Sequence, residues 1–413
     1  MKILPFASLR PATPELAARI ASLPYDVMNT DEARQQAAGN PDCFLHVVRS
    51  EIDLPADTDP HSSAVYDKAA ENLAALVTSG RLVREAEPAL YLYRQTMNGH
   101  AQTAVVACCR IDDYQNGTIL RHEKTRKDKE DDRTTHILRT GANTGQVFLT
   151  YPDVPAIDAL VAAEAARAPL YDFTAVDGIG HTVWRVADPA PLAAAFEQVP
   201  RAYIADGHHR SAASFRAGME LRASAGAQSG TLESDGFMAC IFPASQLRIL
   251  PYNRLVADLN GLSAESFLAA VRERFSVEPT EAPAPSAGQS CCMYLAGRWH
   301  RLAWEVPADA APDRRLDVSV LQERLLAPVL GIDDPRTNQR ISFVGGIRGT
   351  DELVQAVDSG AAAVAFSMFP TTVPEMMAIA DAGLIMPPKS TWFEPKLRSG
   401  LLVHTLDGCA RQA

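Results

Sequence analysis

The stretch Arg201-Ala-Tyr-Ile-Ala-Asp-Gly-His-His-Arg-Ser-Ala-Ala-Ser-Phe-Arg216 joins an apolar run to a run of small residues through a polar turn. The apolar residues Tyr203, Ile204 and Ala205 are typical of the end of a buried strand. Gly207 permits backbone angles that a side chain would obstruct, and the small residues from Ser211 onward favour a helix. We therefore predict a strand, a loop and a helix in this order.

The start of this helix is predicted to bind an anion. Its unpaired N–H groups and the positive end of its dipole would face whatever lies over the loop, which suits phosphate. Arg210 would add a forked, permanently charged group. The phosphate contacts predicted from this loop are Gly207, His209, Arg210 and Ser211.

The two histidines and the aspartate of the loop allow several roles. Joint ligation of a metal by His208 and His209 is the least favoured, because adjacent residues at a turn diverge and no His-Glu-x-x-His motif is present. We expect one histidine to be buried and hydrogen-bonded and the other to contact a ligand. Asp206 would be a general base, a metal-bound carboxylate or a helix cap. The sequence leaves the metal ligands unassigned.

The most charged part of the chain is Arg121–Arg139, and the segment Arg121–Arg133 within it is a second candidate site. Its composition is typical of a solvated helix face with Glu–Lys pairs. The alternative is an active-site segment in which His122 and Glu123 supply acid and base groups. In that case the candidate phosphate ligands of the segment are His122, Lys124, Thr125, Arg126 and Arg133.

Two further segments could contribute to a site. Prolines hold Met386–Lys396 extended, so that this loop could bring cations and hydroxyls to an anionic ligand, or could be an ordinary surface loop. Its candidate ligands are Lys389, Ser390, Thr391 and Lys396. The turn Pro24-Tyr-Asp-Val27 could place Tyr25 and Asp26 at the mouth of a site, although a tight turn capped by the aspartate explains it equally well.

Composition limits the class of protein. The chain has 413 residues, 47% of them apolar, and a net charge of −11. This charge argues against a large nucleic-acid surface, which normally needs a basic face. No apolar run is long enough to cross a membrane and the N-terminus is a poor signal peptide, so we expect a cytoplasmic protein. The seven cysteines are odd in number and lack Cys-x-x-Cys spacing, which favours reduced, buried thiols.

The expected fold is α/β with mixed sheets, in two portions. The Pro-, Ala- and Ser-rich stretch 278–288 marks the boundary, giving an N-terminal portion 1–280 with the phosphate loop and a C-terminal α/β portion 281–413. Asn98-Gly99 predicts a hairpin between strands at 89–95 and 103–111. Other expected elements are helices at 64–79, 156–166 and 263–275 and strands at 43–48, 145–151, 181–186, 235–243, 247–251, 291–295 and 300–304.

Several ordered motifs together resemble a bacterial and archaeal family known as a domain of unknown function. The resemblance spans nearly the whole chain and names no activity. The motifs are Pro24-Tyr-Asp-Val27, Asn40-Pro41, His122-Glu-Lys-Thr125, Asp131-Asp132-Arg133, Ala205-Asp-Gly-His-His-Arg210, Leu250-Pro-Tyr-Asn-Arg254 and Met386-Pro-Pro-Lys-Ser-Thr391.

The loop Asp206-Gly-His-His-Arg210 also resembles the phosphate loop of the ParB/sulfiredoxin superfamily, nearest to the Asp-Gly-His-Thr-Arg loop of free-serine kinases. This resemblance implies a ParB/sulfiredoxin-like core with large insertions, binding of ATP or ADP with Mg²⁺, and L-serine as acceptor. His209 stands where those kinases have threonine. Relatives in the unknown-function family tend to read Leu-Pro-Thr-His-Arg where this chain has Tyr252, Asn253 and a candidate substrate ligand, Arg254.

Three functions follow as hypotheses. The first is a nucleotide-dependent phosphotransferase acting on the hydroxyl of a small metabolite, with Glu123 or Asp206 as the base. The second is a phosphomonoester or nucleotide hydrolase, such as a phosphoserine phosphatase, because the same anion pocket would serve with water as acceptor. The third is a nucleotide-sensing binding protein without turnover. The partners expected are a nucleotide and a small-molecule substrate, and the sequence does not fix the oligomeric state.

Overall fold

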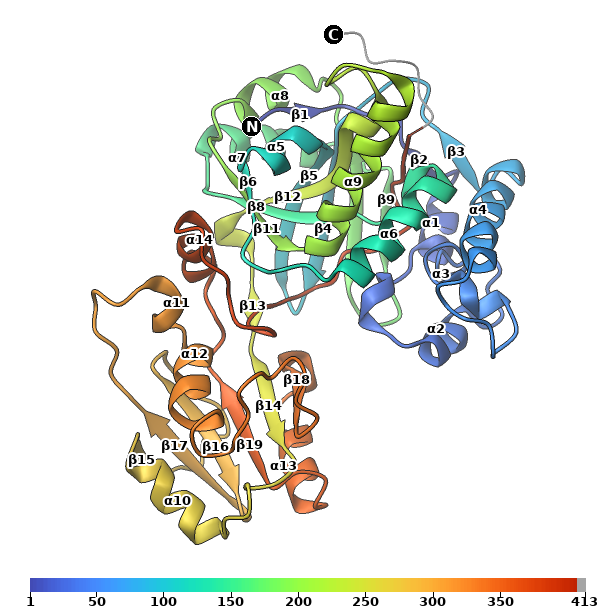
Figure 1. The fold of residues 1–413 in the computed structure, drawn as a ribbon. Coiled ribbons are helices and arrows are strands. Elements are labelled where there is room, and N and C mark those ends of the chain that lie inside the picture. The colour runs from blue at the N-terminus through green and yellow to red at the C-terminus, as the bar shows by residue number, and fades with distance from the viewer. Residues whose placement is uncertain (407–413) are drawn as a thin grey trace. The chain divides into compact units, whose positions relative to one another are not determined.

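The computed structural model describes residues 1–406, which form two compact units (Figure 1). The first unit contains residues 1–247 and the described chain from residue 395 onward, and the second is Arg248–Glu394. Both units combine helices with sheets, which confirms the expected α/β class with mixed sheets.

The first unit is built on a nine-stranded mixed sheet. The pairs β11/β6 and β12/β8 are parallel and the other pairs are antiparallel. The strands in order are β6 (Ile119–Leu120), β11 (Ala202–Asp206), β8 (Val147–Tyr151), β12 (Gly236–Pro243), β5 (His100–Arg110), β4 (Tyr91–Met97), β10 (Gly180–Arg185) and β9 (Tyr171–Thr174), with β1 (Ile3–Leu4) on β5.

Local signals account for the central strands. β4 and β5 form the predicted hairpin, because Asn98 and Gly99 adopt the positive φ angles of +51° and +76° that a two-residue turn requires. All eight residues of β12 are buried, as expected for a strand covered on both faces. The predicted strand before the phosphate loop is also present, as β11.

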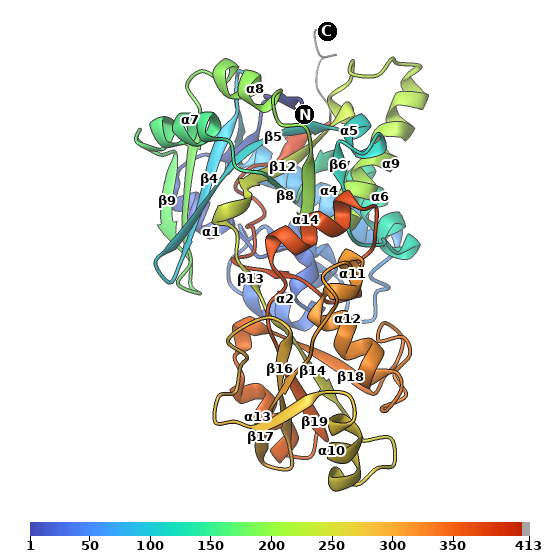
Figure 2. The ribbon, with the colours of Figure 1, turned by 90° about the vertical axis from the view of Figure 1, so that its left-hand side faces the viewer.

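Helices cover the sheet of the first unit on both sides. Figure 2 shows α7 (Pro155–Ala165) and α8 (Ala190–Phe196) on one side and α9 (His208–Ala225) and α6 (Lys127–Thr140) on the other. Ile157 of α7 and Phe196 of α8 are fully buried in the main apolar core. α6 packs along α9, so the charged segment 121–139 is brought beside the phosphate loop.

A second apolar cluster holds the N-terminal helices of the first unit. It includes α4 (Ser63–Thr78), which confirms the helix predicted at 64–79. The strand expected at 43–48 is wrong, because Leu45–Val48 forms a short helix, α3. A short apolar run suits a buried helix as well as a strand, and packing against α4 decides between them here. The cluster also includes residues of α1 (Pro14–Ile20), α2 (Thr30–Ala37), β2 (Leu9–Pro11) and β3 (Leu82–Arg84). The short helix α5 (Ile111–Gln115) packs instead on α9.

The second unit contains a six-stranded antiparallel sheet. Its strands in order are β15 (Ser276–Pro279), β17 (Arg298–Ala303), β16 (Ser290–Leu295), β19 (Val364–Met368), β14 (Tyr252–Val256) and β18 (Ile341–Gly345). Its helices are α10 (Ala264–Arg272), α11 (Pro312–Arg315), α12 (Asp317–Leu321), α13 (Asp351–Asp358) and α14 (Val373–Asp381), and β13 (Ile249–Leu250) pairs with β20 (Trp392–Phe393).

These units divide the chain at different places from the expected portions 1–280 and 281–413. β14 pairs with β18 and β19, and β15 pairs with β17, so the chain from 252 to 279 belongs to the sheet of the later strands. The chain after residue 394 returns to the first unit, where β21 (His404–Thr405) pairs with β7 (Ala142–Asn143). The Pro-rich stretch 278–288 is a loop inside the second unit rather than a boundary.

The described cysteines agree with the expectation of reduced, buried thiols. Six of them are free and buried, and Cys409 lies outside the described residues. Within residues 1–406, no helix combines the length and apolar character needed to cross a membrane.

Candidate functional site

The loop between β11 and α9 depends on a glycine. Gly207 has a φ of +95°, and α9 begins directly after it, at His208 rather than at Ser211. A Cβ atom at this position would lie 3.2 Å from both Cζ and Nε of Arg210. The left-handed backbone favours glycine here, and a side chain at this position would also force the Arg210 guanidinium to shift.

Arg210 is buried beside this loop, and not all of its N–H donors are used in hydrogen bonds to described residues. Its Nη1 donates to the carbonyl of Gln146, and its Nη2 lies 3.6 Å from carboxylate oxygens of both Asp26 and Asp206. Its Nε is buried and has no hydrogen-bond partner among the described residues. A buried guanidinium with an unfilled donor is suited to bind an oxyanion.

Asp206 is held as a carboxylate by three groups. Its Oδ1 accepts a hydrogen bond from the Gly207 N–H at 2.8 Å, and its Oδ2 accepts one from Lys396 Nζ at 3.2 Å. Burial raises the pKa of Asp206, but Lys396 and Arg210 more than offset it and hold this pKa well below its usual range. A carboxylate with so low a pKa is a weak base, so its contacts favour an electrostatic role.

The two histidines of α9 fasten the segment 122–126 to the helix. His208 Nε2 accepts from the His122 N–H at 3.4 Å, and His209 Nε2 accepts from the Arg126 N–H at 3.1 Å. Because each Nε2 is an acceptor, each neutral ring carries its proton on Nδ1. His208 Nδ1 lies 3.7 Å from Glu123, so the two predicted motifs meet here.

His122 lies beneath this contact. It is completely buried, its ring packs edge to face on His208 with centroids 4.5 Å apart, and neither ring nitrogen has a hydrogen-bond partner among the described residues. Burial lowers the pKa of both His122 and His208 to about 3, and the neighbouring His208 lowers the pKa of His122 further. Both rings are therefore neutral at pH 7. Neither can act as a general acid, because its protonated form is scarcely populated.

We expect these two histidines to destabilise the fold in acid. In the unfolded chain each titrates near its ordinary pKa of 6.5, whereas the folded rings stay neutral to about pH 3. The unfolded state therefore binds more protons below pH 6.5, and stability falls as pH drops. Between pH 6.5 and 5 the loss is roughly 1–2 kcal/mol for each histidine.

Urea unfolding at pH 7, 6 and 5 measures this effect. His122→Phe is expected to reduce the pH dependence of the unfolding free energy, and His61→Gln, at a side chain that is 53% exposed, is the control. An unchanged pH dependence in His122→Phe would contradict the buried, neutral state.

A cavity in the first unit is lined by two arginines from distant parts of the sequence. Arg133 comes from α6 and Arg210 from α9. Arg133 donates to Asp132 at 2.8 Å, and its guanidinium lies 4.2 Å from the centre of the Tyr25 ring. The remaining lining residues are Pro24, Tyr25, Val48, His136, Ile137, Asn143, Thr144, Gly145, Ser214 and Ser399.

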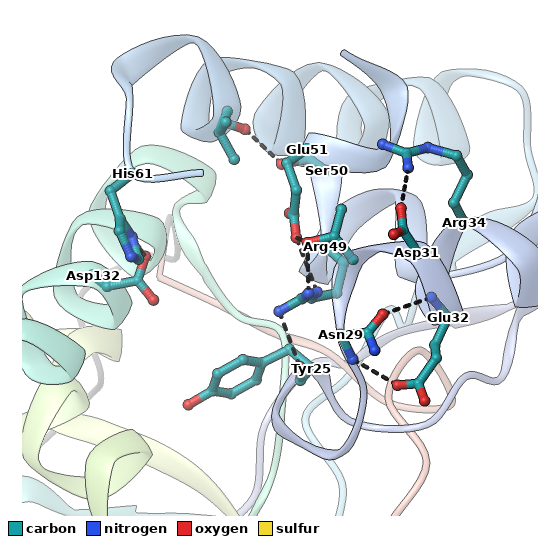
Figure 3. Close-up of polar contacts among 12 residues, drawn as sticks. Tyr25, Asn29, Asp31, Glu32, Arg34, Arg49, Ser50, Glu51, His61 and Asp132 are labelled. Atoms are coloured by element: carbon teal, nitrogen blue, oxygen red, sulfur yellow. Dashed lines mark hydrogen bonds and ion pairs between the residues drawn. The ribbon is translucent and has the colours of Figure 1, made fainter. Parts of the chain in front are cut away.

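Hydrogen bonds from Arg49 hold the turn that carries Tyr25. Figure 3 shows Arg49 between the backbone of Tyr25 and the carboxylate of Glu51. Arg49 Nη1 donates to the Tyr25 carbonyl at 3.4 Å and Nη2 donates to the hydroxyl of Thr30 at 3.0 Å. These contacts hold the ring of Tyr25 against Arg133 and leave Asp26 exposed beside Arg210.

The other predicted ligands of the first unit have local partners or face solvent. Ser211 is completely buried and donates to the Gly207 carbonyl at 3.1 Å. Thr125 donates to Glu130, and Arg126 pairs with Asp128 at 2.8 Å. Lys124 is exposed.

The predicted ligands Arg254, Lys389, Ser390 and Thr391 lie in the second unit. Arg254 is 3% exposed, donates to the carbonyls of Tyr252 and Lys389, and has no ion pair among the described residues. Burial lowers the pKa of Arg254 to about 10. Lys389 lies over the ring of Tyr252, and buried Ser390 donates to the Pro387 carbonyl at 2.7 Å. Lys396 alone of the predicted 386–396 ligands belongs to the first unit, where it contacts Asp206.

Sequence reasoning missed several residues that line the cavity. Asn143 ends β7, Thr144 and Gly145 follow it in the connection to β8, and Ser399 lies on the returning chain. The polar run Asn143-Thr144-Gly145 beside a predicted strand was the available signal, since polar residues at strand ends often line sites. Ser399 had no comparable signal, because its position depends on hydrogen bonds in both directions between its backbone and that of Ser22.

No group of three or more His, Cys, Asp or Glu side chains suited to a metal ion occurs within residues 1–406. Asp26 and Asp206 each have a carboxylate oxygen 3.6 Å from Arg210 Nη2. A magnesium ion beside these carboxylates would take most of its ligands from phosphate oxygens and water, as Mg²⁺ does in most nucleotide sites.

Comparison with known proteins identifies the family of the chain but no activity. The model of the family described as "Protein of unknown function (DUF1015)" matches residues 3–319. No curated protein matches the chain.

Several solved structures show a low similarity. A conserved hypothetical protein from Pyrococcus furiosus is 13% identical, with 72% of this chain and 95% of that chain covered and a TM-score of 0.34. A free serine kinase mutant in complex with ADP is 12% identical, with 72% and 92% covered and a TM-score of 0.35. SbnI with a C-terminal truncation from Staphylococcus aureus is 13% identical, with 72% and 87% covered and a TM-score of 0.40. Scores this low carry no argument about this chain.

Proposed function

Because the chain belongs to the DUF1015 family, whose description names no activity, we propose its function from its own residues. It is a cytoplasmic, nucleotide-dependent phosphotransferase that transfers a phosphoryl group to the hydroxyl of a small metabolite. The donor is ATP or ADP, and Mg²⁺ accompanies it. The acceptor suggested by the resemblance of the loop Asp206–Arg210 to that of free-serine kinases is L-serine.

The observation that carries this proposal is the cavity lined by both Arg133 and Arg210. The two guanidiniums come from different helices and are each largely buried, with side chains 14% and 9% exposed. Buried arginines bind phosphate strongly, because the fork of N–H groups matches its oxygens and little water competes. Catalysis of phosphoryl transfer consists mostly of such positioning and charge neutralisation.

The surrounding groups suggest a division of roles. Glu123 is the proposed base, because it is a partly exposed carboxylate next to the Nδ1–H of His208. Asp206 is too well stabilised as an anion to be a good base, so we propose that it orients Lys396 and Arg210. His209 and Lys124 remain proposed phosphate contacts at the edge of the site. Arg254, Lys389, Ser390 and Thr391 belong to the second unit, and they remain candidate anion ligands of that unit alone.

Product analysis tests the proposal. Purified protein is incubated with ATP or ADP, Mg²⁺ and small hydroxylated metabolites including L-serine, and mass spectrometry follows the acceptor and the nucleotide. The expected result is a phosphorylated acceptor formed in equal amount to the spent nucleotide. Glu123→Gln is expected to lower the rate by roughly 100-fold or more, as loss of a general base does, with nucleotide binding retained.

Other outcomes would replace the proposal. Free phosphate formed without an acceptor would support the hydrolase, and nucleotide binding without turnover would support the sensing protein. Glu130→Gln is the matched control on the same segment, because Glu130 pairs with Thr125 and Arg216. Equal rates for Glu123→Gln and the wild type would contradict the choice of base.

A further inference from the structure

We infer that Asp26 is a built-in competitor of the phosphate group, occupying the anion position beside Arg210 when no ligand is bound. This inference rests on the proposed function, because it requires that Arg210 binds phosphate. In this role Asp26 weakens the binding of phosphate, whereas a residue that holds the ligand strengthens it.

Of the two arginines that line the cavity, Arg210 is the one without a carboxylate at hydrogen-bonding distance among the described residues. Arg133 is paired with Asp132 at 2.8 Å, and Asp206 accepts from Lys396 at 3.2 Å. Arg210 has only two contacts of 3.6 Å, one of them with Asp26. A separation of 3.6 Å is longer than a hydrogen bond, so these carboxylates neutralise Arg210 without filling its donors.

The position of Asp26 allows it to be displaced by a ligand. Its side chain is 36% exposed, whereas that of Arg210 is 9% exposed. The neighbouring Tyr25 is fixed by Arg49 and Arg133, which keeps the backbone of Asp26 near Arg210. Within residues 1–406 the Asp26 carboxylate accepts no hydrogen bond. An exposed carboxylate is hydrated again when it leaves Arg210, so its replacement by a phosphate costs little free energy.

The electrostatic consequence has a definite sign. A phosphate bound at Arg210 is repelled by the carboxylate of Asp26 if that group stays, or must replace it if it moves. Either way the unliganded pair opposes binding. Removing the negative charge while keeping the shape of the side chain should therefore tighten phosphate binding. The size expected for one partly exposed ion pair is about threefold to fivefold in Kd.

Calorimetric titration with inorganic phosphate, and separately with ADP, tests this inference on the full-length protein. Asp26→Asn and Asp26→Ser are both expected to bind about threefold to fivefold more tightly than the wild type. The matched control is Asp31→Asn, which removes the same charge from the following helix, where Asp31 is paired with Arg34. This control is expected to leave the affinity unchanged.

Unchanged or weaker binding in both Asp26 variants, with normal binding by the wild type, would overturn the inference and leave the proposed function intact. Weaker binding would assign Asp26 to the ligand or its cation. Equal tightening by Asp31→Asn would also overturn it, because the effect would then be one of net charge. Absence of binding by the wild type and by all variants would overturn both this inference and the proposed function.

Discussion

Arg210→Ala is expected to weaken the binding of phosphate and of nucleotide by roughly 100-fold or more. The substitution removes the buried guanidinium from the cavity and with it at least two charge-assisted hydrogen bonds to the ligand, together about 3 kcal/mol. It also removes the positive charge beside the carboxylates of Asp206 and Asp26, so these carboxylates repel an anion in the cavity more strongly. Titration calorimetry with ADP and with inorganic phosphate measures the loss.

Two further variants make this result interpretable. Arg216→Ala changes the same residue type on the same helix, but Arg216 pairs with Glu130 and Asp131 and does not line the cavity. It is expected to bind as the wild type does. Arg210→Lys keeps the charge without the fork and is expected to bind with intermediate affinity, which separates loss of binding from loss of folding. Wild-type affinity in Arg210→Ala would remove the central residue of the proposed site.

Gly400→Ala is expected to destabilise the first unit by about 3 kcal/mol. Gly400 has a φ of +88°, and a Cβ atom there would lie 2.7 Å from the ring of Phe44 and 3.0 Å from Ile20. The left-handed backbone costs an alanine about 1–2 kcal/mol, and crowding of a packed core costs about 1–3 kcal/mol more. Because Ser399 precedes this glycine and lines the cavity, phosphate binding should weaken as well.

Gly39→Ala is the matched control for this substitution. Gly39 has a similar φ of +73°, but nothing lies within 4 Å of the position of a Cβ atom. It is therefore expected to lose only the backbone contribution of about 1–2 kcal/mol. Urea unfolding of both variants measures the difference, and equal losses would show that the contact with Phe44 is not restrictive.

The local elements that the sequence predicted correctly each have a signal within a few residues. Asn98-Gly99 predicted the β4–β5 hairpin because few other residues adopt two successive positive φ angles. The helical spacing of apolar residues predicted α4, and the run ending at Ala205 predicted β11. The run at 43–48 failed because its length suits either element and only its packing decides.

The division into units could not be predicted from composition. A Pro- and Ser-rich stretch indicates a loop, and the stretch at 278–288 is indeed a loop, but loops occur inside units as well as between them. Pairing of β14 with β18 and β19 joins the chain near residue 254 to the chain beyond residue 340. Such pairing depends on contacts between strands far apart in sequence, which no local pattern encodes.

Residue types alone specify the chemistry available to this protein: a glycine-containing turn before a helix, a permanently charged arginine after that glycine, and a charged segment elsewhere in the chain. Which of these groups meet depends on the fold. It places Arg133 and Arg210 in one cavity, turns His208 and His209 toward backbone N–H groups of 122–126, and brings Lys396 to Asp206. Residue type fixes charge and hydrogen-bonding capacity locally, whereas proximity arises from strand pairing and helix packing across the whole unit.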